Sequence, residues 1–232
     1  MSEIKVVCAD FDDTFVPSEE ACFALENEVL TRMGRLAMPR EVHLSTWGQP
    51  VFDAMLKRSP GVDIEAFKKQ YDVVIAEFTA AGRLDVVPEE NYVAMDEIVA
   101  SGREFSILTS RTVAELKHIL DPTHRLGSEV VSFWHKDNTS VHKPDPAVFD
   151  EFFRHHAGVR PDECVYVGDS ISDAIATKKR GMWFIASLES GLRSRQDFEA
   201  LEATEGLKVD AYIARFADLP TAVDELEARI TA

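Results

Sequence analysis

Three aspartates, Asp10, Asp12 and Asp13, lie within four positions of one another, just after the apolar run VVCA. Because side chains alternate along a strand, Asp10 and Asp12 should leave the end of such a strand close together. Like charges this close repel one another, and a bound cation relieves the repulsion. A lone acidic turn can equally be a solvated loop or a helix cap, so the question is whether distant residues join the cluster.

A second apolar run, CVYVG, ends in Asp169, and Asp173 follows four residues later. Two acidic strand ends that are neighbours in one sheet need a cation between them. Carboxylate oxygens without a matching set of cysteines and histidines favour Mg²⁺ over zinc. The sequence therefore predicts a Mg²⁺ site at the ends of these two strands.

Two further segments carry groups that suit a phosphate. The run FSILTSR ends in Thr109 and Ser110, whose hydroxyls and backbone amides can donate to phosphate oxygens, and VHKPDPAVF supplies the cation Lys143. Phosphoryl transfer depends mainly on positioning the reactants and on neutralising the charge of the phosphoryl oxygens. Mg²⁺ and Lys143 are the cations expected to supply that neutralising charge.

Short apolar runs alternate with helical patterns over most of the chain, which predicts stacked β-α units. Several of the runs are continuously apolar, as is typical of parallel strands covered on both faces. Strands are expected at 4–11, 104–110, 129–134, 164–169, 182–187 and 210–214, and helices at 88–102, 145–158 and 219–230.

Only helical patterns occur between about residues 17 and 87. A stripe of Cys22, Leu25, Val29, Met33 and Leu36 predicts one helix from Ser18, and a second helix is expected at 63–82. We therefore predict an α/β fold with a doubly wound, mainly parallel Rossmann-like sheet, formed by residues 1–16 and 88–232. Residues 17–87 are expected to form a small inserted α-helical cap over the carboxyl ends of the strands, where ligands bind in such sheets.

Composition narrows the choice of partners and compartment. The formal net charge of −16 over 232 residues argues against nucleic acid or an anionic membrane as a partner, but not against a small anionic substrate. The three cysteines have no paired spacing, and the N-terminus lacks a signal-peptide pattern, so a cytoplasmic protein is expected. No apolar run approaches the ~20 residues of a membrane span. The sequence leaves the oligomeric state open.

The order of the motifs DFDDT, LTS, HKPDP and GDSISD resembles the haloacid dehalogenase-like superfamily of phosphotransferases. The phrase KPDPAVF and the helical insert resemble its phosphoglycolate phosphatase-type branch, and the resemblance covers essentially the whole chain. It implies that Asp10 is the nucleophile that becomes an aspartyl phosphate. It implies that Asp12 is the general acid and base, with its backbone carbonyl facing the metal.

The same resemblance implies the remaining roles. Thr109 and the Ser110 amide would bind phosphate oxygens, and Lys143 would steady the nucleophile and the transferring group. Asp169 would be a metal ligand, with Asp173 as a second ligand or as an acid that holds a water. Together with Asp10 and Asp12, these two aspartates form the expected metal site.

One departure from the family pattern and one cap loop stand out. Asp13 occupies a position where the family usually has glycine, which questions the local charge and turn geometry. Gly48 matches the glycine of the family's substrate-specificity loop, so Trp47 and Gln49 could face the substrate. Alternatively, Trp47 packs in the core of the cap itself.

The arginines carry weaker signals. Arg111 follows the Thr109–Ser110 pair and is expected to be an exposed helix-capping residue, with contact to substrate as the alternative. Arg32, Arg35 and Arg58 show no informative spacing and are expected at the surface.

These observations predict a Mg²⁺-dependent phosphatase of small phosphorylated metabolites. A sugar phosphomutase on the same fold is the nearest alternative, and a phospho-accepting receiver-type signalling domain is an alternative from another class. A dehalogenase is disfavoured because that chemistry lacks an acid at the position of Asp12. An inactive binding protein is disfavoured because Asp10, Asp12, Lys143 and Asp169 are all present.

Overall fold

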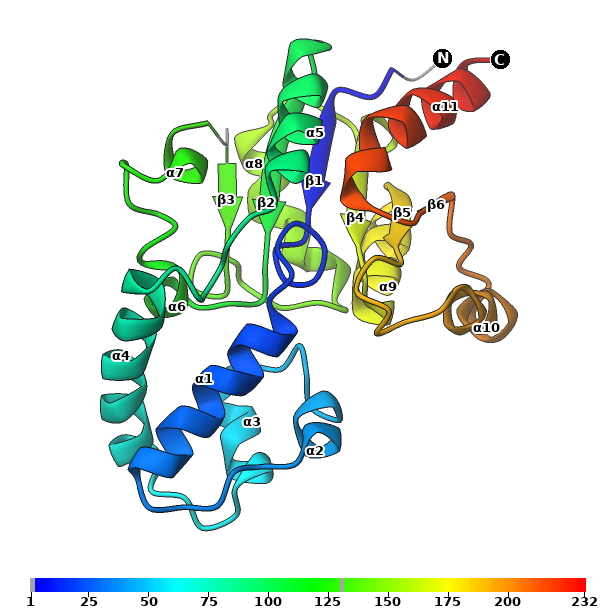
Figure 1. Cartoon of the computed structure of the whole chain (residues 1–232). Helices are drawn as coiled ribbons and strands as arrows, with labels where there is room; N and C mark the ends of the chain where they lie inside the picture. The colour runs from blue at the N-terminus through cyan, green and yellow to red at the C-terminus, as the bar shows by residue number, and fades with distance from the viewer. Residues whose placement is uncertain (1–2, 130–131) are drawn as a thin grey trace. The chain divides into compact units, whose positions relative to one another are not determined.

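The computed structural model describes residues 3–129 and 132–232 of the chain, and these form two compact units (Figure 1). Residues 1–15 and 87–232 belong to the first unit, and residues 16–86 belong to the second. In the part of the chain that is described, no helix has the length and apolar character needed to cross a membrane.

The first unit is built on one sheet of six parallel strands in the order β3-β2-β1-β4-β5-β6. This confirms the predicted α/β fold with a doubly wound parallel sheet. Every expected strand is present, although each is shorter than predicted, and the expected strand at 129–134 lies partly outside the described residues. The strands are β1 (Val6–Ala9), β2 (Glu104–Leu108), β3 (Ser132–Trp134), β4 (Cys164–Gly168), β5 (Trp183–Ser187) and β6 (Ala211–Ile213).

Helices cover both faces of this sheet, which explains why its strands are continuously apolar. On one face Val6 and Cys8 share a core with the helices that follow β3, β4 and β5. On the other face the ring of Phe105 lies 5.8 Å from that of Phe15, which in turn lies 5.9 Å from Tyr92. The helices of this unit are α5 (Glu89–Ala100), α6 (Val113–Leu116), α7 (Arg125–Glu129), α8 (Asp150–His155), α9 (Ile171–Arg180), α10 (Arg195–Glu205) and α11 (Leu219–Thr231), with short 3₁₀ turns at Pro146–Phe149, Pro161–Glu163 and Phe216–Asp218.

The second unit contains four helices and has its own apolar core. The helices are α1 (Glu19–Arg32), α2 (Arg40–Leu44), α3 (Val51–Arg58) and α4 (Ile64–Ala80). Leu25, Val29, Phe67 and Val74 are all buried in this core, as their helical spacing predicts. Leu36 was expected on the same stripe, but it lies beyond the end of α1 and is 91% exposed.

A network of charged side chains is buried inside the second unit. The Nη1 atom of Arg58 lies 2.6 Å from both carboxylate oxygens of Glu26, and Arg58 Nε donates to Thr46 Oγ1 at 2.7 Å. The prediction that Arg58 lies at the surface is therefore wrong. Burial of this arginine is possible because a buried carboxylate compensates its charge. Arg32, by contrast, is exposed as expected, and Arg35 is half-buried.

Candidate active site at the carboxyl edge of the sheet

Asp10 stands at the first position beyond β1, the strand where the strand order reverses direction. Its backbone N–H donates to the carbonyl of Val167 at 2.8 Å, so the pairing with β4 continues to this residue. Its Oδ1 atom accepts from the N–H of Phe11 at 2.8 Å. The backbone thus fixes a buried carboxylate at the edge where parallel sheets bind ligands.

Asp169 and Asp173 reach the same place from β4 and α9. Asp169 directly follows β4, and Asp173 lies in the first turn of α9, where its Oδ2 atom accepts from Ser170 Oγ at 2.6 Å and Ser170 N at 3.0 Å. A Cβ on Gly168 would lie only 2.6 Å from Asp173 Oδ2, so the helix can start this close to β4 because residue 168 has no side chain.

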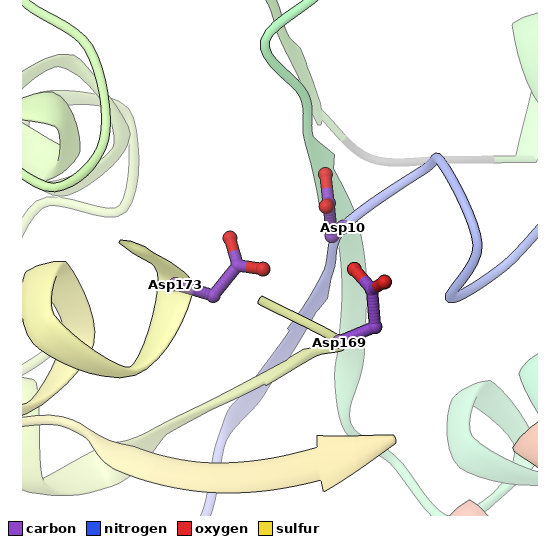
Figure 2. A group of neighbouring side chains, drawn as sticks. All are labelled: Asp10, Asp169 and Asp173. Atoms are coloured by element: carbon purple, nitrogen blue, oxygen red, sulfur yellow. The ribbon is translucent and has the colours of Figure 1, made fainter. Parts of the chain in front are cut away.

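Asp10, Asp169 and Asp173 form one carboxylate group, with an oxygen from each lying within 4.8 Å of the others (Figure 2). All three are buried. Burial, opposed by Lys143 and reinforced by Asp173 and Asp12, raises the pKa of Asp10 to about 8. Burial also raises the pKa of Asp169 well above its ordinary value, and the neighbouring Asp173 and Asp10 add to the effect.

Three carboxylates this close together and this buried repel one another when charged, so their charged forms need positive charge beside them. A hard divalent cation bound by carboxylate oxygens would supply it, and the donor set contains no sulfur or imidazole. The group therefore fits Mg²⁺ in its chemistry.

Lys143 is the cation within this group. Its Nζ lies 3.0 Å from Asp10 Oδ1 and 2.6 Å from Asp173 Oδ1, and its side chain is 5% exposed. Burial disfavours the charged form of this amine, but Asp10 and Asp173 outweigh that effect and raise the pKa of Lys143 above its ordinary range. Lys143 is therefore a fixed positive charge beside the carboxylate of Asp10.

Tyr166 supports this arrangement and was not singled out from the sequence. Its hydroxyl donates to the carbonyl of Leu108 at 2.8 Å and accepts from Lys143 Nζ at 3.1 Å. Burial raises the pKa of this phenol well above its ordinary value, so it stays neutral. Within the apolar run CVYVG, a tyrosine reads as a core residue, and no spacing distinguishes it from one.

The carboxylate of Asp12 contacts Arg111. Arg111 Nε donates to Asp12 Oδ2 at 3.0 Å, and Nη2 donates to Oδ1 at 2.5 Å. Arg111 is only 8% exposed, so the expectation of an exposed helix-capping residue is wrong. Asp12 is not one of the three residues of the carboxylate group, and its backbone carbonyl stays a predicted metal ligand.

Thr109 and Ser110 follow β2 at the same edge of the sheet. The backbone N–H of Thr109 donates to the carbonyl of Trp134 at 2.9 Å, and Thr109 Oγ1 accepts from the N–H of Arg111 at 3.2 Å. Ser110 is half-buried. Because β2 pairs with β1 in parallel, both residues leave the sheet beside the strand that carries Asp10.

Asp13, which replaces the usual glycine, has a backbone φ of 54°. This is the left-handed region, which glycine adopts freely and which aspartate tolerates better than most residues. The side chain is buried, and its charge contributes to the raised pKa of Asp169. The turn after Asp12 therefore keeps a glycine-like backbone while adding one more acid.

The three predicted specificity residues all belong to the helical unit. The ring of Trp47 lies 5.0 Å from that of the buried His43, and Gln49 Oε1 accepts from Lys57 Nζ at 3.0 Å. Gly48 has a φ of 85°, a conformation that requires glycine at this turn. Trp47 therefore packs at least partly within its own unit, and contact of these residues with a substrate stays a prediction.

Residues 7–187 match the haloacid dehalogenase-like hydrolase family. Among curated proteins, the sequence has no match.

Several solved structures share the fold. A putative haloacid dehalogenase-like hydrolase from Bacteroides fragilis is 20% identical, with a TM-score of 0.74 over 94% of this chain and 100% of its own. CbbY from Rhodobacter sphaeroides in complex with phosphate is 19% identical, with a TM-score of 0.74 over 95% and 99%. A predicted phosphoglycolate phosphatase from Haemophilus somnus is 17% identical, with a TM-score of 0.75 over 100% of both chains.

Proposed function

Because this chain belongs to the haloacid dehalogenase-like hydrolases, we propose that it is a Mg²⁺-dependent phosphatase of small phosphorylated metabolites. The observation that carries this proposal is the placement of Asp10 beside the buried cation Lys143 and two further buried carboxylates. The similarity in fold to CbbY with bound phosphate and to a predicted phosphoglycolate phosphatase supports the same reaction class.

In the first step, a carboxylate oxygen of Asp10 attacks the phosphorus of the substrate. The bond from phosphorus to the leaving oxygen breaks, and Asp12 gives that oxygen a proton. Lys143, together with the donors on Thr109 and Ser110, would offset the charge on the transferring group.

In the second step, a water molecule attacks the phosphorus of the aspartyl phosphate. Asp12 takes the proton from this water, the bond between phosphorus and the Asp10 oxygen breaks, and inorganic phosphate leaves. The covalent route thus replaces one difficult displacement by water with two easier displacements, in the first of which Asp10 is the nucleophile.

Asp10, Asp169 and the backbone carbonyl of Asp12 would hold Mg²⁺, which supplies positive charge to the phosphoryl oxygens when it is bound. Asp173 already contacts Ser170 and Lys143 through its two oxygens. We therefore infer that Asp173 holds a water of the ion rather than the ion itself.

We infer that the helical unit, residues 16–86, acts as a cap that chooses the leaving group and excludes water from the reaction. Its loop Trp47–Gln49 is the part that we expect to contact the non-phosphate end of the substrate. The cytoplasmic location expected from the sequence stays a prediction.

The direct test uses p-nitrophenyl phosphate with Mg²⁺ or with EDTA, followed by a panel of phosphorylated metabolites. Steady turnover that requires Mg²⁺ supports the phosphatase, whereas a single stoichiometric phosphorylation supports the receiver-type alternative. Asp10→Asn should abolish turnover, and Asp72→Asn, a change at an exposed position of α4, should leave it intact. Activity above a few per cent of wild type in Asp10→Asn would rule out the assigned nucleophile.

A further inference from the structure

The planar guanidinium of Arg111 binds the carboxylate of Asp12 at two points. Arg111 Nε and Nη2 each donate to a different oxygen of this carboxylate, at 3.0 Å and 2.5 Å. A two-point contact of this kind fixes both the position and the plane of a carboxylate, which a single contact to a lysine cannot do. The rotation of Asp12 about its side-chain bonds is therefore restricted while the contact lasts.

Both the backbone and the guanidinium of Arg111 make further contacts. Its backbone N–H donates to Thr109 Oγ1 at 3.2 Å, and its backbone carbonyl accepts from the N–H of Lys136 at 2.8 Å. At the other end, the guanidinium carbon lies 5.1 Å from the ring centroid of Phe11, which is fully buried. A guanidinium stacked on an aromatic face loses little further freedom when it binds an anion.

This stacking brings Arg111 to the short segment that carries both proposed reactive acids. Phe11 separates Asp10 from Asp12 in the chain, and the charge of Asp12 acts on Asp10. A carboxylate that moved freely near Asp10 would compete with it for Lys143 and for any bound cation. A fixed contact to Arg111 keeps the two carboxylates apart.

We propose that Arg111 is a positioning residue that holds the Asp12 carboxylate where it can take the proton from the attacking water. The inference deepens the proposed function and rests on it. In this arrangement Arg111 acts only through Asp12. The two oxygens keep lone pairs that Arg111 does not use, so the carboxylate can still accept a proton from water while the fork is in place.

The proposal predicts that loss of Arg111 slows the hydrolysis of the aspartyl phosphate. The p-nitrophenolate group leaves well without a proton, so the first step with p-nitrophenyl phosphate depends little on Asp12, and hydrolysis of the aspartyl phosphate becomes limiting. Arg111→Gln should lower kcat about 10- to 100-fold, at or below the lower end of the roughly 100- to 10,000-fold contribution of a general base, because the variant misplaces Asp12 but does not remove it. It should also produce a burst of p-nitrophenolate and an accumulated phosphoenzyme. Arg111→Lys should fall between this variant and wild type.

The test is a double-mutant cycle of Arg111→Gln and Asp12→Ala, combined with crystal structures of wild type and Arg111→Gln. If Arg111 acts only through Asp12, the double variant turns over at the rate of Asp12→Ala, and the two losses are strongly non-additive. A further loss of 10-fold or more in the Asp12→Ala background would overturn the proposal, because Arg111 would then act on the substrate directly.

The crystal structures decide the inference independently of activity. A displaced or disordered Asp12 carboxylate in Arg111→Gln supports the proposal, and a carboxylate in its wild-type position overturns it. Failure of the proposed function would show differently, as turnover that survives in Asp10→Asn.

Arg103→Gln is the matched control. Arg103 is 11% exposed on its side chain and also pairs with two carboxylates, those of Asp224 and Glu227, at 2.7 Å and 2.8 Å. Arg103 belongs to the same unit, and neither of these two partners is a proposed reactive residue. Replacement of Arg103 should lower stability without producing a burst of p-nitrophenolate. The thermal unfolding of each variant then shows whether a loss of activity comes from a loss of folded protein or from a displaced Asp12.

Discussion

Replacing Lys143 by glutamine removes the cation between two buried carboxylates. The variant leaves Asp10 and Asp173 facing each other without the amine that lies 3.0 Å from one and 2.6 Å from the other. Removing one partner of a buried ion pair typically costs about 3–5 kcal/mol of unfolding free energy. The loss should approach this size at a pH where Asp10 is charged in the wild type.

The loss should depend on pH, and its direction follows from the pKa of Asp10. Burial raises this pKa from 3.8 to about 8 in the protein without a divalent ion, so the folded state holds a proton that the unfolded state releases. The wild type therefore loses stability as pH rises from about 4 to about 8 in EDTA, by at most about 1.4 kcal/mol per pH unit for this one group. Without Lys143, Asp10 should keep this proton to a higher pH than in the wild type, so the penalty of the variant should stay nearly constant from pH 5 to about 7 and grow above pH 8.

The measurement is urea-induced unfolding followed by circular dichroism at pH 5, 6.5 and 9, in EDTA and in excess Mg²⁺. Mg²⁺ should recover part of the loss, because it replaces the missing positive charge. Lys68→Gln is the control, since Lys68 pairs with Glu65 at 2.7 Å on the exposed face of α4, and its loss should stay within about 0.5 kcal/mol. A penalty for Lys143→Gln below about 1 kcal/mol at pH 9, or equal penalties at pH 6.5 and pH 9, would refute the reasoning.

Three further outcomes are expected. Mg²⁺ at ten times its dissociation constant should raise the unfolding free energy by about 1.4 kcal/mol, and Asp169→Asn should largely remove this gain in a Mg²⁺ titration of thermal unfolding. Burial lowers the pKa of His156 below 6.5, although Glu104 at 2.9 Å opposes the shift, so stability present above pH 6.5 should be lost as pH falls below it. In urea unfolding, the wild type should lose stability relative to His156→Asn as pH falls from 7.5 to 5.5; a constant difference between the two would assign the dependence to other groups. Arg58→Met should destabilise the chain by about 3–5 kcal/mol by removing the arginine that compensates the buried charge of Glu26, and a second change, Glu26→Leu, should restore part of this; equal losses in the single and double variants would contradict the pairing.

The sheet could be predicted from the sequence because burial on both faces leaves a direct trace in the amino-acid order. The runs around Val7 and Val165 are apolar without alternation, a pattern typical of parallel strands covered by helices on both sides. Helix ends were harder to predict. Leu36 continues the spacing of the α1 stripe, but Gly34, with a φ of 71°, follows the end of the helix before the stripe is complete.

Asp10 and Asp169 could be proposed as a site because each follows an apolar run, and parallel strands bring such positions to one edge. Lys143 and Asp173 could be added because the motifs HKPDP and GDSISD resemble those of the family. Arg111 could not be placed in this way. Its partner Asp12 lies 99 positions away, and no periodicity records a pairing over that distance. Tyr166 was hidden for the opposite reason, since a tyrosine within a buried strand has the same local pattern whether or not its hydroxyl serves a neighbouring lysine.

The central place of β1 in the sheet affects how the chain is made. This strand leaves the ribosome first, and it has one neighbour in β2 and the other in β4. At translation speeds of about 5–20 residues per second, the roughly 150 residues between β1 and β4 take on the order of ten seconds or more to synthesise. During that time one edge of an apolar strand has no native partner, which is the state in which strands pair with other chains. The nascent protein should therefore need help from chaperones until β4 has emerged, even after β2 has paired with one edge of β1.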